Sequence, residues 1–368
     1  RNLQRLEERG LIERAADPAD ARAATASLTS AGEKTAAELE EQEIVSAGAL
    51  LQLLPPERRV AVVQGLEDLI EAIRDGFRAD WSMPVKHQHF VPVPGEPDAK
   101  LMMMPAWAEG EHIAVKVVNL FPGNSARGLP AVNAMVMLMD GRTGECLALI
   151  DGGEVTARRT AATSALAADY LARPDSRHLV VVGTGRVAGD NLVEAHTVLR
   201  PIDRITVWGR DFQKAETVAA RVSGGGIAAS ATEDLATAVA DADIVTCATL
   251  SQTPLIRGEW LKAGAHVDLV GAYSPTSREA DDETIRRATV FVDTRAGALH
   301  ATGDIAEPLK SGVLREEDVA ADLFDLTRGV HAGRRDPDEI TLFKSVGAAI
   351  EDLAAARLVY ARCAGDAA

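Results

Sequence analysis

Consecutive apolar residues mark the most clearly patterned part of the chain. Residues 179–182 read Leu-Val-Val-Val and lead directly into a glycine, and similar short runs recur at residues 204–208, 244–249, 266–271 and 289–292. Uninterrupted runs of this length are typical of strands buried on both faces of a parallel sheet. Because the segments between the runs are long enough for helices, the pattern predicts an α/β fold with a doubly wound parallel sheet.

A different pattern precedes these runs. Residues 60–77 carry apolar side chains at helical spacing, which predicts an amphipathic helix, and the alanine-rich residues 154–171 predict a second helix. Strands are expected at residues 101–105, 113–119, 131–139 and 146–150. The sequence therefore predicts a second domain of the α+β class, with a last helix over residues 346–360.

Changes in composition suggest where the domains begin and end. Pro55-Pro56 interrupts the chain and separates a charged segment, residues 1–54, from the rest. We expect the first part of the α+β domain over residues 55–173 and the nucleotide-binding domain over residues 174–300. Residues 301–368 are then expected to return to the α+β domain.

The first strand of the predicted sheet ends in the motif Gly183-x-Gly185-x-x-Ala188. A strand, this glycine turn and a following helix form the fingerprint of dinucleotide binding. Gly183 permits the tight turn, Gly185 lets the backbone approach a pyrophosphate, and Ala188 keeps the helix close to the sheet. The N–H groups at the start of that helix face the phosphates.

The end of the next strand meets the adenosine ribose in this fold. Here the strand runs into Gly209-Arg210-Asp211. An arginine can bind the 2′-phosphate of NADP, so Arg210 favours NADPH over NADH. Asp203 precedes the strand and Asp211 comes one residue late, so neither fits well as the acidic ligand that NADH requires.

Charge and cysteine content exclude several classes of protein. The net charge is −16, so we do not expect the main part of the chain to bind nucleic acid or an anionic membrane surface. The three cysteines are scattered and form no Cys-x-x-Cys pair, as in proteins of a reducing cytosol. We find no apolar run of transmembrane length and no signal peptide, and we expect a cytoplasmic protein.

Three polar features suggest local chemistry. Lys116 interrupts an apolar run and needs an anionic partner or a cavity, because burying an unpaired charge is very unfavourable. Arginines at 158 and 159 lie early in a predicted helix, where the dipole disfavours cations, which indicates a nearby anion. His87 and His89 form a His-x-His pair without a third ligand, so we expect a packed or hydrogen-bonded pair and no metal site.

The first segment has a pattern of its own. It contains Leu3, Arg5, Leu6 and Gly10-Leu11-Ile12 in a predicted helix that runs through Arg14, followed by Asp17-Pro18, Asp20, Arg22 and a short strand at residues 23–29. This pattern resembles the second half of a MarR-type winged-helix regulator. A DNA reader of this class needs its complete helix-turn-helix, so we do not expect the chain as given to bind nucleic acid.

A set of separated motifs from residue 60 to 360 occurs in one order. They are Lys86, Lys116, residues 158–165, Gly183-Thr184-Gly185, residues 249–250, Val270-Gly271 and residues 344–347. Together they resemble the ornithine cyclodeaminase/μ-crystallin family. The resemblance implies an N-terminal substrate and dimerisation domain, a Rossmann domain and a homodimer.

The resemblance also implies roles for individual residues. Lys86, where the family usually has arginine, and Lys116 fall on the substrate carboxylate, and Arg159 falls at the junction of substrate and cofactor. Lys116 and Arg159 are the catalytic candidates, and Val346 is expected in the substrate pocket. The residues expected along the cofactor are Ala131, Arg159, Gly183, Thr184, Gly185, Arg186, Val187, Arg210, Thr249, Val270, Gly271 and Ser345.

One departure from the family pattern bears on the reaction. Cyclodeaminases of this family carry a catalytic aspartate just before a loop proline, and this chain has Tyr273 at that place. Tyrosine is a poor general base at neutral pH. The sequence is therefore more similar to the reductase branch, which reduces cyclic ketimines such as Δ1-pyrroline-2-carboxylate and Δ1-piperideine-2-carboxylate to L-proline and L-pipecolate. Glu279 and Asp281 are expected to cap the next helix rather than replace that aspartate.

Several alternatives remain open from the sequence. Within the family, the chain could be an ornithine cyclodeaminase, which releases ammonia, or an alanine dehydrogenase, which acts on an open-chain oxo acid. Outside it, a metabolite-sensing regulator would use the reductase-like part as a sensor. A pure binding module would bind NADPH without turnover.

Overall fold

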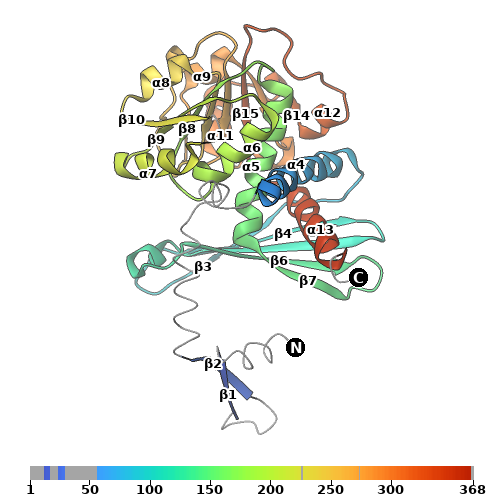
Figure 1. Ribbon diagram of the computed structural model, residues 1–368. Helices are drawn as coiled ribbons and strands as arrows, with labels where there is room; N and C mark the ends of the chain where they lie inside the picture. The colour runs from blue at the N-terminus through green and yellow to red at the C-terminus, as the bar shows by residue number, and fades with distance from the viewer. Residues whose placement is uncertain (1–11, 17–23, 30–55, 225–226, 273, 366–368) are drawn as a thin grey trace. The chain divides into compact units, whose positions relative to one another are not determined.

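The computed structural model describes residues 12–16, 24–29, 56–224, 227–272 and 274–365 (Figure 1). The chain divides into two units, residues 1–54 and residues 55–368.

In the first unit, the described residues form an antiparallel pair of strands. Strand β1 (Ile12–Ala16) pairs with β2 (Ala24–Leu28), and Ile12 lies opposite Leu28. The strand predicted over residues 23–29 is confirmed. The helix predicted through Arg14 is wrong from Ile12 onward, because these residues take their backbone hydrogen bonds from β2. The remainder of the winged-helix pattern, including Arg22, lies outside the described residues.

An eight-stranded parallel sheet forms one layer of the second unit. Its strand order is β10-β9-β8-β11-β12-β15-β13-β14, and every neighbouring pair is parallel. The strands are β8 (His178–Val182), β9 (Arg204–Trp208), β10 (Ala228–Thr232), β11 (Ile244–Cys247), β12 (His266–Leu269), β13 (Ala288–Val292), β14 (Val319–Asp322) and β15 (Ile340–Lys344). This confirms the predicted parallel sheet.

Helices cover both faces of this sheet. They are α6 (Leu192–Leu199), α7 (Phe212–Val222), α8 (Leu235–Asp241), α9 (Asp282–Arg287), α10 (Arg295–Ala298), α11 (Gly303–Ser311) and α12 (Leu323–Thr327), with short 3-10 turns at Gly258–Trp260 and Glu316–Asp318. Because side chains alternate along a strand, Leu179 and Val181 of β8 enter one apolar core while Val180 and Val182 enter the other. Burial on both faces explains why the sequence shows an unbroken apolar run.

The second layer is a five-stranded antiparallel sheet with the order β3-β4-β5-β6-β7. Its strands are β3 (His87–Val91), β4 (Ala99–Ala108), β5 (His112–Leu120), β6 (Val132–Asp140) and β7 (Cys146–Asp151), with a 3-10 segment at Pro122–Arg127. Figure 1 shows α4 (Pro56–Arg78), α5 (Gly152–Leu171) and α13 (Ala349–Gly365) on one face of this sheet. The predicted α+β domain is therefore present.

Buried side chains hold these helices on the sheet. Leu69, Ile70, Ile73 and Phe77 of α4 are buried, which confirms the amphipathic helix predicted there, and they share one core with Leu138 of β6. Alanines of α5 and α13 enter the same core and let the helices approach closely.

The return of the chain to the α+β domain was expected from residue 301 and occurs later. Strands β14 and β15 follow that residue but hydrogen-bond within the eight-stranded sheet. They belong there because Leu342 and Phe343 are buried in the cores on its two opposite faces. Of the described helices after residue 301, α12 and α13 both pack against α4, and α13 also packs against the antiparallel sheet. The boundary expected between residues 173 and 174 stays a prediction.

Among the described residues, no helix combines the length and the apolar character that a membrane span requires.

Candidate active site

The order of strands creates a crevice at the centre of the eight-stranded sheet. Strands β8, β9 and β10 run outward to one side, and the chain then crosses back to β11 on the other side of β8. A reversal of this kind opens a crevice at the carboxyl ends of the strands, where nucleotides bind in such sheets. The segments that follow β8, β9, β11 and β12 meet at that edge, and they carry most of the predicted cofactor residues.

The glycine loop after β8 has the geometry that a pyrophosphate needs. Gly183 has φ 129°, and a Cβ atom there would lie 2.6 Å from the carbonyl oxygen of Ala248. A Cβ atom at Gly185 would have no heavy atom within 4 Å, so this backbone stays open to a ligand. Thr184 packs against the end of β9, because a Cβ atom at Gly209 would lie 2.5 Å from its methyl group. The residues present therefore fit a dinucleotide phosphate group.

The connection from this loop to α6 contains one irregular turn. Val187–Asn191 form a π-helical turn, in which Ala188 is fully buried, and α6 begins only afterwards. Arg186 forms an ion pair with Glu154 of α5, which also pairs with Arg158 at 3.3 Å. The turn thus ties the glycine loop to the start of α5.

Arg210 lies exposed immediately after β9, at the predicted ribose position. The two acidic residues near it have other partners. Asp211 caps α7 by accepting the N–H of Lys214 at 3.3 Å, and Asp203 pairs with Arg177 at 2.5 Å. Both carboxylates therefore stabilise the protein's own structure.

Thr249, Val270 and Gly271 lie together at the ends of β11 and β12. A Cβ atom at Gly271 would come within 2.1 Å of the Thr249 nitrogen, so the two backbones are in direct contact. Asp281 caps α9 as predicted, accepting the Thr284 N–H at 2.8 Å. The cap predicted for Glu279 is wrong, because its carboxylate instead accepts hydrogen bonds from Thr249 and Gly271.

A second group of predicted residues lies where β5, α5 and α13 meet. Lys116 is 1% exposed and donates a hydrogen bond of 2.8 Å to Asp352 Oδ1. The same oxygen lies 3.1 Å from Nε of Arg159, whose Nη1 also pairs with Glu351. The anionic partner predicted for Lys116 is thus present. Burial lowers the pKa of Lys116 to about 8, with Arg159 adding to the shift and Asp352 opposing it.

Lys86 approaches this group from the other side. Its Nζ donates to the carbonyl oxygen of Val346 at 3.3 Å, and burial lowers its pKa. The segment 345–347 is held by Asp293, which accepts the N–H groups of Val346 at 2.5 Å and Gly347 at 2.8 Å. Gly347 has φ 80°, and a Cβ atom there would lie 2.8 Å from Nη1 of Arg159. Lys86 and Arg159 therefore both approach the segment 345–347, and Lys116 is linked to Arg159 through their shared contact with Asp352.

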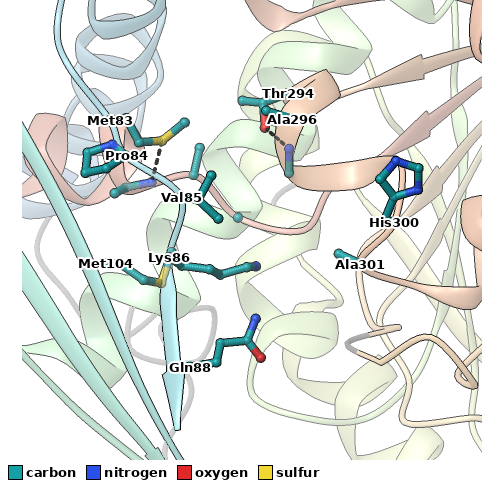
Figure 2. Close-up of a pocket in the computed structure, with 14 residues that line it drawn as sticks. Met83, Pro84, Val85, Lys86, Gln88, Met104, Thr294, Ala296, His300 and Ala301 are labelled. Atoms are coloured by element: carbon teal, nitrogen blue, oxygen red, sulfur yellow. Dashed lines mark hydrogen bonds between the residues drawn. The ribbon is translucent and has the colours of Figure 1, made fainter.

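A cavity of about 220 Å³ lies beside Lys86. Figure 2 shows Lys86 and Gln88 pointing from one wall toward His300 and Ala301 on the other. Most of its lining is apolar: Met83, Pro84, Val85, Met104, Ala296, Ala301, Ala348 and Ala349. The cavity thus combines an apolar surface with a cation, an arrangement that suits a small organic acid.

Three acidic residues in this network were not predicted from the sequence. Asp293, Glu351 and Asp352 are each 0% exposed, and burial raises the pKa of Asp293 and Glu351. The buried lysine indicated that an anion must be near, but nothing local to residue 116 identified it. The available signal was the acidic pair Glu351-Asp352, which lies in the alanine-rich stretch of residues 349–356.

The carbonyl oxygen of Ala131 accepts the N–H of Phe121 at 2.8 Å, and the expected contact of Ala131 with the cofactor stays a prediction. His87 and His89 are exposed on β3 rather than packed. In the part of the chain that the structure describes, no three His, Cys, Asp or Glu residues are arranged to hold a metal ion. Tyr273 lies outside the described residues.

Comparisons with known proteins agree with this geometry. The model of the ornithine cyclodeaminase/mu-crystallin family matches residues 23–367. A Δ1-pyrroline-2-carboxylate reductase of Paracoccus denitrificans is 41% identical over 299 residues, which cover 81% of this chain and 93% of that protein.

Two solved structures are also similar. One is Δ1-pyrroline-2-carboxylate reductase of Thermococcus litoralis in complex with NADH and L-proline, with TM-score 0.77, 35% identity and coverage of 82% of this chain and 94% of that chain. The other is an archaeal alanine dehydrogenase dimer with bound NAD, with TM-score 0.76, 30% identity and coverage of 82% and 93%.

Removing one carboxylate from the buried network tests its contribution to stability. Asp352→Ala leaves Lys116 and Arg159 short of a partner in the core, and we expect the free energy of unfolding to fall by about 3–5 kcal/mol. Asp68→Ala, which breaks the exposed pair with Arg362, should cost no more than about 1 kcal/mol. Urea unfolding followed by circular dichroism measures both; equal losses would contradict the described burial.

Proposed function

The chain belongs to the ornithine cyclodeaminase/mu-crystallin family, and on that premise we propose that it reduces cyclic ketimino acids with NADPH. The substrates would be Δ1-pyrroline-2-carboxylate and Δ1-piperideine-2-carboxylate, and the products L-proline and L-pipecolate. The observation that carries this proposal is that Lys86 and Arg159 both approach the segment 345–347, with Lys116 sharing Asp352 with Arg159.

The substrate carboxylate would bind to these cations. Lys86 lines the cavity, and within the described residues its ammonium group donates to one carbonyl oxygen at 3.3 Å, so it can turn to an anion. Lys116 and Arg159 are paired with their own carboxylates, Asp352 and Glu351, and Arg159 packs against Gly347 of the cavity lining. An ammonium group lacks the planar fork of the arginine usual at position 86, so one oxygen of the substrate would be held at a time.

The apolar lining would hold the ring, and the crevice would place the cofactor over it. Bound NADPH supplies the hydride that reduces the imine carbon. Fixing the substrate at contact distance can remove on the order of 7–11 kcal/mol of the barrier. Lys116 is the proposed donor of the proton on the imine nitrogen, which makes the carbon more electrophilic.

Arg210 supports NADPH as the reductant. It is exposed at the end of β9, and Asp203 and Asp211 are engaged in an ion pair and a helix cap. The similar solved structures contain NADH or NAD, so this preference belongs to our proposal for the present chain.

A homodimer is the proposed assembly. The face of the antiparallel sheet that α4, α5 and α13 leave uncovered carries rows of apolar residues across paired strands, such as Pro105, Val115, Met137 and Leu149. Leu149 is 64% exposed in the single chain. An apolar sheet face of this kind is typical of protein interfaces, and a similar alanine dehydrogenase is a dimer.

Parallel assays distinguish this activity from its rivals. NADPH absorbance is followed with the five- and six-membered ketimines, with pyruvate plus ammonia, and with ornithine, while released ammonia is measured separately. We expect oxidation of NADPH with the two ketimines, and a raised KM for them in Lys86→Ala. Ammonia release from ornithine without ketimine consumption would indicate a cyclodeaminase, and faster turnover of pyruvate plus ammonia an alanine dehydrogenase.

The proposed role of Lys116 predicts a pH dependence. Its pKa of about 8 means that the ammonium form predominates below that pH, so kcat/KM for a ketimine should fall as the pH rises through about 8. Lys116→Arg keeps the charge and should remove this basic limb, whereas Lys116→Met should lose turnover at saturating substrate. Lys310→Met, at an exposed lysine of α11, is the control. Near-normal turnover of Lys116→Met would exclude Lys116 as the donor.

Substitution at the ribose position tests the preference for NADPH. Arg210→Ala should raise the KM for NADPH about tenfold or more, since a hydrogen bond to a charged group contributes about 1.5–3 kcal/mol. The KM for NADH should change little, because NADH has no 2′-phosphate. Arg286→Ala, at an exposed arginine of α9, serves as control. Equal effects on both cofactors would contradict the assignment.

A further inference from the structure

A second set of buried charges lies at the crevice, apart from the network around Lys116. Glu279, Asp304 and Lys344 are each 0% exposed. They come from the segment before α9, the first turn of α11 and the end of β15. We call these three residues the crevice clamp. The proposed reaction assigns them no role.

The carboxylate of Glu279 joins the segments that follow β11 and β12. One oxygen accepts the N–H of Thr249 at 2.6 Å and its hydroxyl at 2.9 Å. The other oxygen accepts the N–H groups of Gly271 at 2.7 Å and Ala272 at 3.2 Å. All four donors therefore belong to two crevice segments, and none belongs to the helix that follows Glu279.

The other two members fix Glu279 in place. Asp304 accepts the backbone N–H groups of Glu279 at 2.7 Å and Ala280 at 3.3 Å. Lys344 lies 3.1 Å from Asp304 and donates to the carbonyl oxygen of Ala272 at 3.3 Å. The clamp therefore connects the carboxyl ends of β11, β12 and β15 through buried contacts.

A carboxylate meets a specific requirement here. Each oxygen of Glu279 serves two donors, which the amide of a glutamine cannot do, because one of its ends is itself a donor. The two segments already touch at Gly271 and Thr249, so a loss of these hydrogen bonds changes their spacing directly. Burial raises the pKa of Glu279 to about 7, while Lys344 and the hydrogen bonds from Thr249 oppose the shift.

We propose that Glu279 is a positioning residue that sets the spacing of the two segments flanking the nicotinamide half of the cofactor. The proposal rests on the nicotinamide chemistry of the proposed function. The adenine half is held elsewhere, by the glycine loop after β8 and the end of β9, so a loosened clamp affects one half of the cofactor and spares the other.

Asp243 provides a matched control at the opposite edge of the sheet. Its carboxylate likewise accepts two backbone N–H groups, from Arg177 at 2.8 Å and His178 at 3.0 Å. Arg177 precedes β8, His178 is the first residue of β8 and Asp243 precedes β11, so the contacts lie at the amino ends of the strands. Asp243→Asn removes a carboxylate that also pairs with Arg173 at 2.8 Å and Lys262 at 2.7 Å, without touching the crevice.

The test compares the complete cofactor with the same molecule lacking nicotinamide. Dissociation constants are measured for NADPH and 2′-phospho-ADP-ribose, and for NADH and ADP-ribose, with wild type, Glu279→Gln and Asp243→Asn. For Glu279→Gln we expect about tenfold or more weaker binding of the complete cofactor and less than about twofold change for the shortened one. Asp243→Asn should lower the melting temperature and leave the ratio of the two constants unchanged.

The proposal is overturned if Glu279→Gln keeps the wild-type ratio of the dissociation constants for the complete and the shortened cofactor. It is also overturned if the wild-type protein binds the complete cofactor no more tightly than the shortened one. If Glu279→Gln does not fold, Thr249→Val removes one donor and should change the ratio in the same direction by a smaller factor; an unchanged ratio there also overturns it. Because the readout is binding, a wild type that binds NADPH but reduces no ketimine would refute the proposed reaction while leaving this test intact.

Discussion

A charge withdrawn from water must be paired inside the protein, and this requirement determines how the second unit is assembled. Lys116 and Arg159 lie in the core where β5, α5 and α13 meet, and their partners are both on α13. Leaving either cation unpaired in that position is strongly unfavourable. The ion pairs therefore favour the one position of α13 on the antiparallel sheet that brings its carboxylates to these cations. The cations of the candidate site therefore also help to hold α5 and α13 on the antiparallel sheet.

Buried carboxylates organise the rest of the site by accepting backbone N–H groups. Asp293 holds the segment 345–347, and Glu279 holds the segments after β11 and β12. Loops at the ends of parallel strands have donors that no strand neighbour can satisfy. A carboxylate meets several of them at once, which gives flexible connections a fixed shape without adding regular structure.

Sequence patterns predicted those parts of the fold whose conformation depends on neighbouring residues in the chain. The valine run and Gly183-x-Gly185 indicated a buried strand and a phosphate loop, because their conformations depend on adjacent residues. The assignment of β14 and β15 to the parallel sheet was not predicted, since pairing between distant strands leaves no periodic signal. Lys116 likewise indicated that a partner exists, while the choice of Asp352 depends on the path of the whole chain.

The separation of that pair along the chain has a consequence for biosynthesis. Lys116 leaves the ribosome 236 residues before Asp352. At about 5–20 residues per second, the interval is roughly 10–50 s. During it the antiparallel sheet has neither the cover of α13 nor the counter-charge for its central lysine. The core on the antiparallel sheet is therefore completed only when α13 has been synthesised. A polypeptide whose synthesis stops before that helix exposes an incomplete core to the cell's chaperones and proteases.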